Sequence, residues 1–254
     1  MSFLNGPGSG WGQSGTPVGN TPGYGAQPTP QVAAQTQGAF LTHAFTWMFA
    51  GLLLSAAVAL AVQGNAGLQQ FTEDAFLPLI IGQLALVLVI SWGINRVDAT
   101  VALGLFFVYA ASLGLTLGLI VSAYAAQQGG EASVVEAFVS ASVMFGAAAL
   151  YGATTKRSLA GLGGILVMGV VGLIVAMVVN VFLASSTVDL VISVIGVVLF
   201  TALTAWDVQR ISVGQLVAMT GSVEKAAVLG ALRLYLDFIN LFLFLLRLFG
   251  GGRR

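Results

Sequence analysis

Long apolar runs separated by short polar stretches dominate the chain from residue 40 onward. A helix needs roughly 20 mostly apolar residues to cross the hydrocarbon core of a bilayer. Six runs meet this length, and they cover Phe40–Gln63, Leu77–Asn95, Thr100–Tyr124, Val134–Gly152, Leu159–Ala184 and Val188–Arg210. The pattern therefore predicts six membrane-spanning helices.

A seventh run, Ala226–Phe249, is also long enough to span but carries Arg233, Asp237 and Asn240. Ionisable side chains inside a membrane almost always face other helices rather than lipid. We therefore expect this helix to be enclosed by the other six. Because of its length, we expect it to cross the membrane fully rather than to re-enter on the same side. The predicted fold is an all-α membrane protein, a seven-helix bundle built around its C-terminal helix.

The N-terminal stretch has a different composition. Residues 1–38 are rich in Gly, Pro, Ser, Thr and Gln and contain no charged side chain. Such a segment cannot bury enough apolar surface to offset the entropy cost of ordering it. It also lacks the basic and apolar regions of a secretory signal. We predict a disordered tail at residues 1–38, followed by a membrane domain at residues 39–254.

Composition narrows the function classes. The chain is 57% hydrophobic and only 7% charged, whereas soluble domains average about 25% charged residues. Its zero net charge argues against nucleic-acid binding. It has no cysteine and one histidine, His43, which excludes disulfides, thiol catalysis and metal sites built from Cys or His clusters. We expect a protein that is not an enzyme and has no bound cofactor.

Charged residues in the predicted loops are divided unequally between the two sides of the membrane. One side holds every loop Lys and Arg, and the other side holds only acidic residues. The first side carries Arg96, Asp98, Lys156, Arg157, Arg210, Glu224 and Lys225, and the second carries Glu73, Asp74, Glu131, Glu136 and Asp189. The positive-inside rule predicts that the basic side is cytoplasmic, which places the N-terminus in the cytoplasm.

Two aspartates inside the last two apolar runs are the main candidates for function. Asp207 lies near the cytoplasmic end of the sixth run, and Asp237 lies deeper in the seventh. The short connection between these runs favours neighbouring helices, so the two carboxyls can approach each other. Two carboxylates in a site of low dielectric constant cannot both ionise cheaply, so the pair can share a proton. Loss of that proton would push the helices apart and leave oxygen ligands for a transient Ca²⁺ ion.

Local neutralisation is the alternative interpretation of the same residues. Arg210 follows Asp207 by three residues, and Arg233 precedes Asp237 by four. These spacings put each pair on one helix face, so each aspartate would be a satisfied structural ion. Arg96, at the cytoplasmic end of the second run, is a further possible charge partner for Asp207, although an anchor at the membrane surface is its plainer role.

Several motifs resemble those of a known family. Trp-Asp-Val-Gln-Arg-Ile at residues 206–211 resembles an aromatic-Asp-x-Gln-x-Ile motif, and Leu-Tyr-Leu-Asp-Phe-Ile-Asn-Leu-Phe at residues 234–242 is similar to a second, specific motif. Residues 137–138, 151–156 and 168–172 also fit. Together they resemble the Bax inhibitor-1 family, the transmembrane Bax inhibitor motif proteins, in its bacterial branch. The resemblance covers about residues 38–250.

The resemblance implies a role for each of these charged groups. It implies a calcium leak channel in the bacterial inner membrane, gated by a pH-sensing aspartate pair that falls on Asp207 and Asp237, and an arginine partner that falls on Arg96. Trp206 stands where the family usually has Tyr, and Val208 where Thr is common. Gln83 stands where an acid would be expected, so a third carboxylate cannot be assigned.

Two other functions remain open from the sequence. Family members also act as binding regulators, and the resemblance therefore implies an alternative: a non-conducting regulator that binds a membrane protease or a cell-death or stress factor. Two buried acids on adjacent helices would also suit an intramembrane aspartyl protease. Those enzymes, however, place their second aspartate in Gly-x-Gly-Asp, whereas Asp237 follows Leu-Tyr-Leu.

Overall fold

The computed structural model describes residues 30–251, with side chains described from residue 40 onward. Within this range the chain forms nine α-helices and one short 3-10 helix, and no strand. They are α1 (Pro30–Gly64), α2 (Ala66–Asp74), α3 (Phe76–Gly93), α4 (Ala99–Ala125), α5 (Gly130–Thr154), η1 (Ala160–Leu162), α6 (Gly163–Leu183), α7 (Ser186–Ser212), α8 (Gln215–Thr220) and α9 (Val223–Gly251). The predicted all-α class is confirmed.

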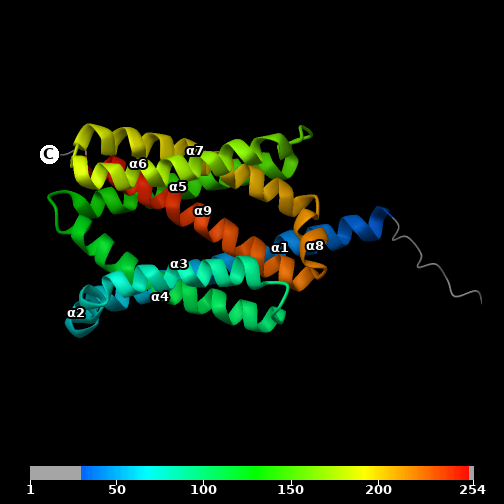
Figure 1. Cartoon of the computed structure of the whole chain (residues 1–254), viewed down its shortest axis with the longest axis horizontal. Coiled ribbons are helices and arrows are strands. Elements are labelled where there is room, and N and C mark those ends of the chain that lie inside the picture. Colours follow the sequence, from blue (N-terminus) through cyan, green and yellow to red (C-terminus); the bar gives the residue numbers. More distant parts are fainter. Residues whose placement is uncertain (1–29, 252–254) are drawn as a thin grey trace, which may run out of the picture.

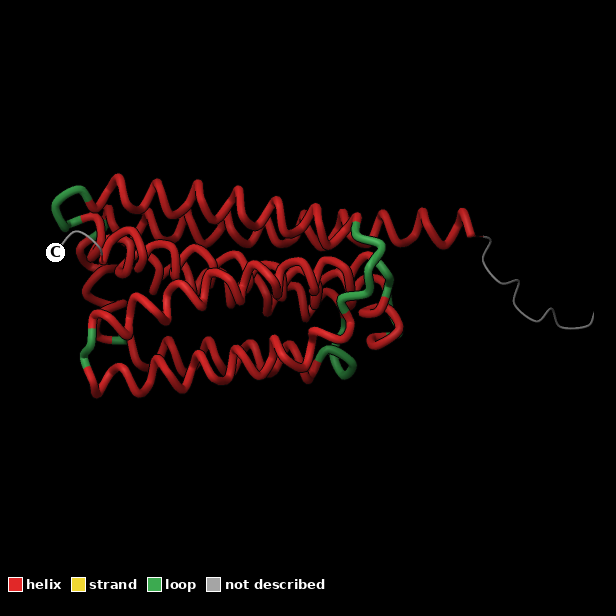
Figure 2. Tube along the Cα trace, turned by 90° about the horizontal axis from the view of Figure 1, so that it is seen from above, coloured by secondary structure: helices red, strands yellow, loops and turns green. Residues whose placement is uncertain are grey.

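Seven of the described helices are long and apolar enough to cross a membrane: α1, α3, α4, α5, α6, α7 and α9. The helices run nearly side by side, and the connections gather at the two ends of the bundle (Figure 2). Large apolar side chains such as Trp92 and Phe182 are 78% and 83% exposed. In a membrane-spanning bundle, an apolar surface of this kind faces lipid tails.

Helix α9 is the centre of the bundle. It runs obliquely between the α5–α7 group and the helices α1, α3 and α4 (Figure 1). In its most apolar window 78% of the residues are buried, whereas no other span exceeds 44%. The prediction that the C-terminal helix is enclosed by the others is therefore confirmed. Helix α9 also extends from one end of the bundle to the other, as expected for a full crossing.

Small residues let the helices around α9 approach closely. A Cβ atom added to Gly114 of α4 would lie 2.7 Å from the carbonyl oxygen of Ser55 in α1, and one added to Gly118 would lie 2.7 Å from Cβ of Val62. Gly152 of α5 faces the backbone of Ala205 in α7 in the same way. Close backbone contact at small residues is typical of helix packing in membranes.

The chain differs from the sequence-based boundaries in three places. Helix α1 begins at Pro30, so the end of the predicted tail is helical, and the rest of that tail lies outside the described residues. Helices α2 and α8 were expected to be loops. Asn65 caps α2 by accepting a hydrogen bond from the backbone N–H of Leu68 at 3.1 Å. Gly214 and Gly221 bound α8 with φ values of 72° and 67°, a conformation that favours glycine.

The connections give the bundle two chemically different ends. We call the end with the α3–α4, α5–α6 and α7–α9 connections the basic end; it holds Arg96, Lys156 and Arg157 in the connections and Arg210 and Lys225 in the adjoining turns of α7 and α9. We call the opposite end the acidic end; it holds Glu73, Asp74, Glu131 and Asp189. The C-terminal end of α9 lies at the acidic end.

Candidate functional site

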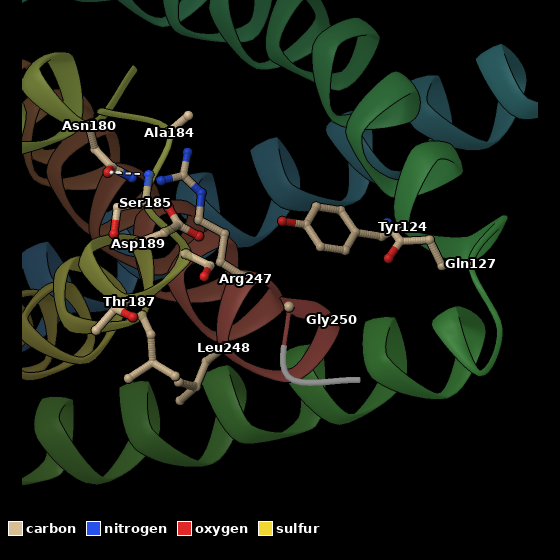
Figure 3. Close-up of a pocket in the computed structure, with 13 residues that line it drawn as sticks. Tyr124, Gln127, Asn180, Ala184, Ser185, Thr187, Asp189, Arg247, Leu248 and Gly250 are labelled. Carbon is tan, nitrogen blue, oxygen red and sulfur yellow. Dashed lines mark hydrogen bonds between the residues drawn. The ribbon is translucent and has the colours of Figure 1, made fainter. Parts of the chain in front are cut away.

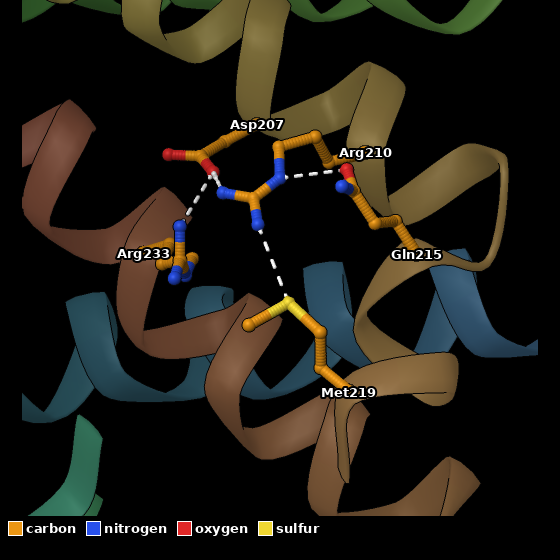
Figure 4. A network of polar contacts seen from close by, with 5 residues as sticks. All are labelled: Asp207, Arg210, Gln215, Met219 and Arg233. Carbon is orange, nitrogen blue, oxygen red and sulfur yellow. Dashed lines mark hydrogen bonds and ion pairs between the residues drawn. The ribbon is translucent and has the colours of Figure 1, made fainter. Parts of the chain in front are cut away.

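Asp207 lies at the centre of an ionic contact between the two innermost helices. It occupies α7 near the basic end and is only 5% exposed. Nη1 of Arg233, on α9, donates a hydrogen bond to Oδ1 of Asp207 at 3.1 Å. Nη1 of Arg210, one turn along α7, lies 3.7 Å from the same oxygen. Two guanidinium groups from two helices therefore share one buried carboxylate (Figure 4).

Helix α8 fixes the position of Arg210. The Nε atom of Arg210 donates to Oε1 of Gln215 at 2.9 Å, and its Nη2 atom contacts Sδ of Met219 at 3.4 Å. Its guanidinium also lies 4.4 Å from the ring centroid of Trp206, a favourable cation–π contact. Arg210 thus divides its contacts among several partners. Arg233 makes the shorter contact with Asp207, at 3.1 Å compared with 3.7 Å for Arg210.

Asp237 lies deeper in the bundle than Arg233. It is one turn further along α9, about 6 Å along the helix axis at 1.5 Å per residue, and is 5% exposed. Its Oδ2 atom is buried and has no hydrogen-bond partner among the described residues. An ionised carboxylate without partners in such a place is costly. Asp237 would therefore gain from binding a proton or a cation.

The local neutralisation expected from sequence spacing is present only in part. Arg210 does approach Asp207 within α7, but Arg233 crosses to Asp207 and forms no ion pair with Asp237 in the described part of the chain. Arg96 is exposed beyond the end of α3, and no ion pair joins it to Asp207 in residues 30–251. The structure therefore brings Arg233 and Arg210 to Asp207 and leaves Arg96 outside.

Motif residues beside the two aspartates hold the surrounding helices in place. The side chain of Gln209 accepts a hydrogen bond from the backbone N–H of Leu159 at 2.7 Å and donates one to the carbonyl oxygen of Arg157 at 2.8 Å. It thereby ties the α5–α6 connection to α7. Sequence reasoning gave Gln209 no role, although its place two residues after Asp207 in the motif was a usable signal.

Tyr235 anchors the other motif to the opposite side of the bundle. Its hydroxyl shares a hydrogen bond of 2.7 Å with the hydroxyl of Ser55 in α1. The hydroxyl of Ser55 also lies 2.7 Å from the carbonyl oxygen of Ala110 in α4. The ring of Tyr235 packs edge-on against Phe106 and Tyr109. These contacts fix the rotation of α9, and with it the direction of Asp237.

A cavity of about 630 Å³ opens at the acidic end of the bundle. Its lining includes Tyr124, Asn180, Asp189 and Arg247 (Figure 3). Nη1 of Arg247 contacts Sδ of Met177 at 3.6 Å. Sequence reasoning gave Arg247 no role, although an arginine within the bounds of a membrane-spanning run is uncommon.

The described residues contain no group of three or more His, Asp or Glu side chains that would hold a metal ion. Ca²⁺ usually takes six to eight oxygen ligands in its sites. The two carboxylates of Asp207 and Asp237 offer four oxygens at most, fewer than such a site needs.

Comparisons with known proteins identify the family of the chain. The family described as "Inhibitor of apoptosis-promoting Bax1" matches residues 37–254, which include both aspartate motifs. The chain belongs to the Bax inhibitor-1 family. The family resemblance of the motifs is thereby confirmed over nearly the whole membrane domain.

Bacterial proteins are similar to this chain over most of their length. The chain is 43% identical over 230 residues to "Inner membrane protein YbhL" of Escherichia coli K12, covering 88% of this chain and 95% of the relative. It is 43% identical over 215 residues to an uncharacterized protein of Deinococcus radiodurans, covering 84% and 90% of the two chains. With its seven apolar helices, this supports a multi-pass inner membrane protein.

Proposed function

We propose that the chain is a calcium leak channel of the inner membrane whose opening depends on the protonation of Asp207 and Asp237. The observation that carries this proposal is the contrast between the two carboxyls. Asp207 is held by Arg210 of its own helix and by Arg233 across the α7–α9 interface, whereas Asp237 is buried with an oxygen that has no partner among the described residues. The calcium ion itself comes from the family resemblance.

The contrast suggests a direction for the pH response. A proton on Asp237 removes the cost of an unpaired buried charge and allows the closed packing of α7 on α9. Loss of that proton places a second negative charge close to Asp207, with Arg233 and Arg210 as the cations nearby. Repulsion between the carboxylates and an open carboxylate ligand both favour entry of a cation. We expect calcium flux to rise as pH rises through the titration of the pair.

Calcium flux into proteoliposomes containing purified protein tests this proposal. We expect Asp237→Asn to reduce the flux and to flatten its pH dependence, because the amide imitates the protonated carboxyl. Asp207→Asn releases Arg233 from α7, and we expect it to shift the pH profile. Asp98→Asn is the matched control, because Asp98 is exposed at the basic end and should leave the profile unchanged. Unaltered profiles in both site variants would refute the proposal.

A non-conducting regulator is the second candidate. It is favoured by the family description, which speaks of inhibiting an apoptosis-promoting protein. Such a regulator would bind a membrane protease or a stress factor without passing ions. The same liposome experiment separates the two functions, since a regulator would give no more flux than empty liposomes.

In the channel proposal the basic end faces the cytoplasm, in keeping with the positive-inside rule.

A further inference from the structure

Polar side chains follow one face of α9 from the basic end to the acidic end. Arg233, Asp237, Asn240 and Arg247 lie four, three and seven residues apart. Steps of three and four residues keep side chains on one face of a helix. The single apolar position in this series is Phe244, which occupies the step between Asn240 and Arg247.

A matching series follows α7. Asp189, Ser193, Thr204 and Asp207 share one face of this helix by the same spacing rule, and Gly196 and Phe200 fill the steps in the middle. Ser193 is 1% exposed and Thr204 is fully buried. Each hydroxyl donates to a backbone carbonyl of its own helix at 2.8 Å. Each therefore keeps acceptor lone pairs free toward its neighbours.

Contacts at three levels show that the two series face each other. At the basic end Arg233 binds Asp207. In the middle, the rings of Phe200 and Phe244 stack with centroids 5.7 Å apart and an interplanar angle of 26°. At the acidic end Asp189 and Arg247 line the same cavity. The register of two antiparallel helices then places Asn240 opposite the turn from Phe200 to Thr204.

Phe200 and Phe244 are closely packed against their neighbours. A Cβ atom added to Gly196 would lie 2.6 Å from two ring atoms of Phe244. Phe244 and Phe200 are only 4% and 8% exposed. The guanidinium of Arg247, a residue that lines the acidic-end cavity, lies 5.7 Å from the ring centroid of Phe244. On the other side, the side chain of Arg233 is still 29% exposed.

We propose that a cation crosses the bundle along the α7–α9 interface and that Phe200 and Phe244 are the barrier that closes this route. The proposal rests on the channel function and assigns its path. The acidic-end cavity is the entrance to the route at one end of the bundle. The polar site nearest the other end is formed by Asp207 and Asp237. Between them the route is blocked by two stacked rings rather than by the ion pair alone.

A truncation of Phe244 tests the barrier. We expect Phe244→Ala to raise calcium flux several-fold, and Phe244→Leu, which keeps more apolar volume, to raise it less. Phe242→Ala is the matched control. Phe242 is a buried phenylalanine of the same helix, but it packs edge-on against Phe138 of α5 at 6.4 Å and lies off the polar face. Equal flux changes in the variants at 242 and 244 would refute the barrier.

Cysteine labelling tests the route without measuring ion flux. The chain has no native cysteine, so a single Ser193→Cys or Thr204→Cys variant carries one thiol. Because both positions are buried, the probe is Ag⁺, a thiol-reactive cation small enough to follow a cation route. We expect Ag⁺ to reach residue 193 only from the acidic end and residue 204 only from the basic end. Adding Phe244→Ala should make each thiol reactive from both sides.

The two experiments fail in distinguishable ways. If neither thiol reacts from either side while flux still depends on Asp237, the route is wrong and the channel function stands. If the thiols react as expected while purified protein conducts no calcium, the channel function is wrong and the polar route remains. Melting temperatures of the purified variants show whether each one is folded before it is labelled.

Discussion

Arg233 and Asp207 join the two central helices of the bundle through a hydrogen bond of 3.1 Å. The same arginine lies one turn from Asp237, yet it turns away from its own helix to reach α7. The contact therefore links the packing of α7 on α9 to the charge state of the site.

Loss of the guanidinium at Arg233 should destabilise the protein. Arg233→Gln leaves Asp207 with Arg210 at 3.7 Å as its only cation in the described structure. A hydrogen bond to a charged group contributes about 1.5–3 kcal/mol, and we expect a loss of free energy of unfolding in this range. Thermal unfolding in detergent measures it. Arg96→Gln, at an exposed arginine without an ion pair in the described residues, should change little, and an equal loss there would contradict the assignment.

Neutralising Asp237 should have the opposite effect. Asp237→Asn removes a buried carboxylate whose Oδ2 lacks a partner in the described structure, and we expect a gain of about 1–3 kcal/mol, the cost of an unsatisfied buried polar group. The gain should be present in mildly alkaline buffer and should fade as pH falls, because wild-type Asp237 then becomes protonated. Melting temperatures across a pH series measure this. A constant difference at every pH would mean that Asp237 does not titrate in the folded protein.

The sequence predicted the fold well because lipid imposes a simple rule on it. A spanning helix must be long and apolar, so the seven crossings and the central place of α9 follow from length and from the polar residues in the last run. Helices α2 and α8 escaped detection because they are too short to produce a spanning signal. They depend instead on the cap at Asn65 and on the positive φ angles of Gly214 and Gly221.

The contacts around Asp207 were only partly predictable from the sequence. Spacing along one helix predicted the approach of Arg210 to Asp207, which the structure contains, and it paired Arg233 with Asp237. It favoured pairing within a helix, whereas the rotation and register of α9 against α7 decide that Arg233 crosses to Asp207. That register depends on long-range contacts, such as the hydrogen bond between Tyr235 and Ser55, which no local pattern encodes.

Close packing of α5 against α7 predicts a strong effect at one glycine. A Cβ atom at Gly152 would collide with the backbone of Ala205, which cannot move aside as a flexible side chain would. We expect Gly152→Ala to cost about 1–3 kcal/mol, the usual penalty of overpacking. Gly146 of the same helix has nothing within 4 Å of an added Cβ atom, so Gly146→Ala should be neutral or stabilising. Chemical or thermal unfolding measures the stability of both variants, and an equal loss in the two would contradict the prediction.

Gln209 predicts that the α5–α6 connection supports the aspartate site from outside the bundle. Gln209→Ala removes two hydrogen bonds, and Gln209→Glu removes only one of them. A carboxylate can still accept from the backbone N–H of Leu159 but cannot donate to the carbonyl oxygen of Arg157. At about 0.5–1.5 kcal/mol per bond, Ala should destabilise the protein beyond the loss of one bond. Gln209→Glu should also lower the stability of the protein, because its negative charge would lie beside the carbonyl oxygen of Arg157. Because the two hydrogen bonds join α7 to the α5–α6 connection, both substitutions should also speed backbone hydrogen exchange in residues 155–162. A variant that lost stability but left exchange there unchanged would show that the tether is not what holds the connection.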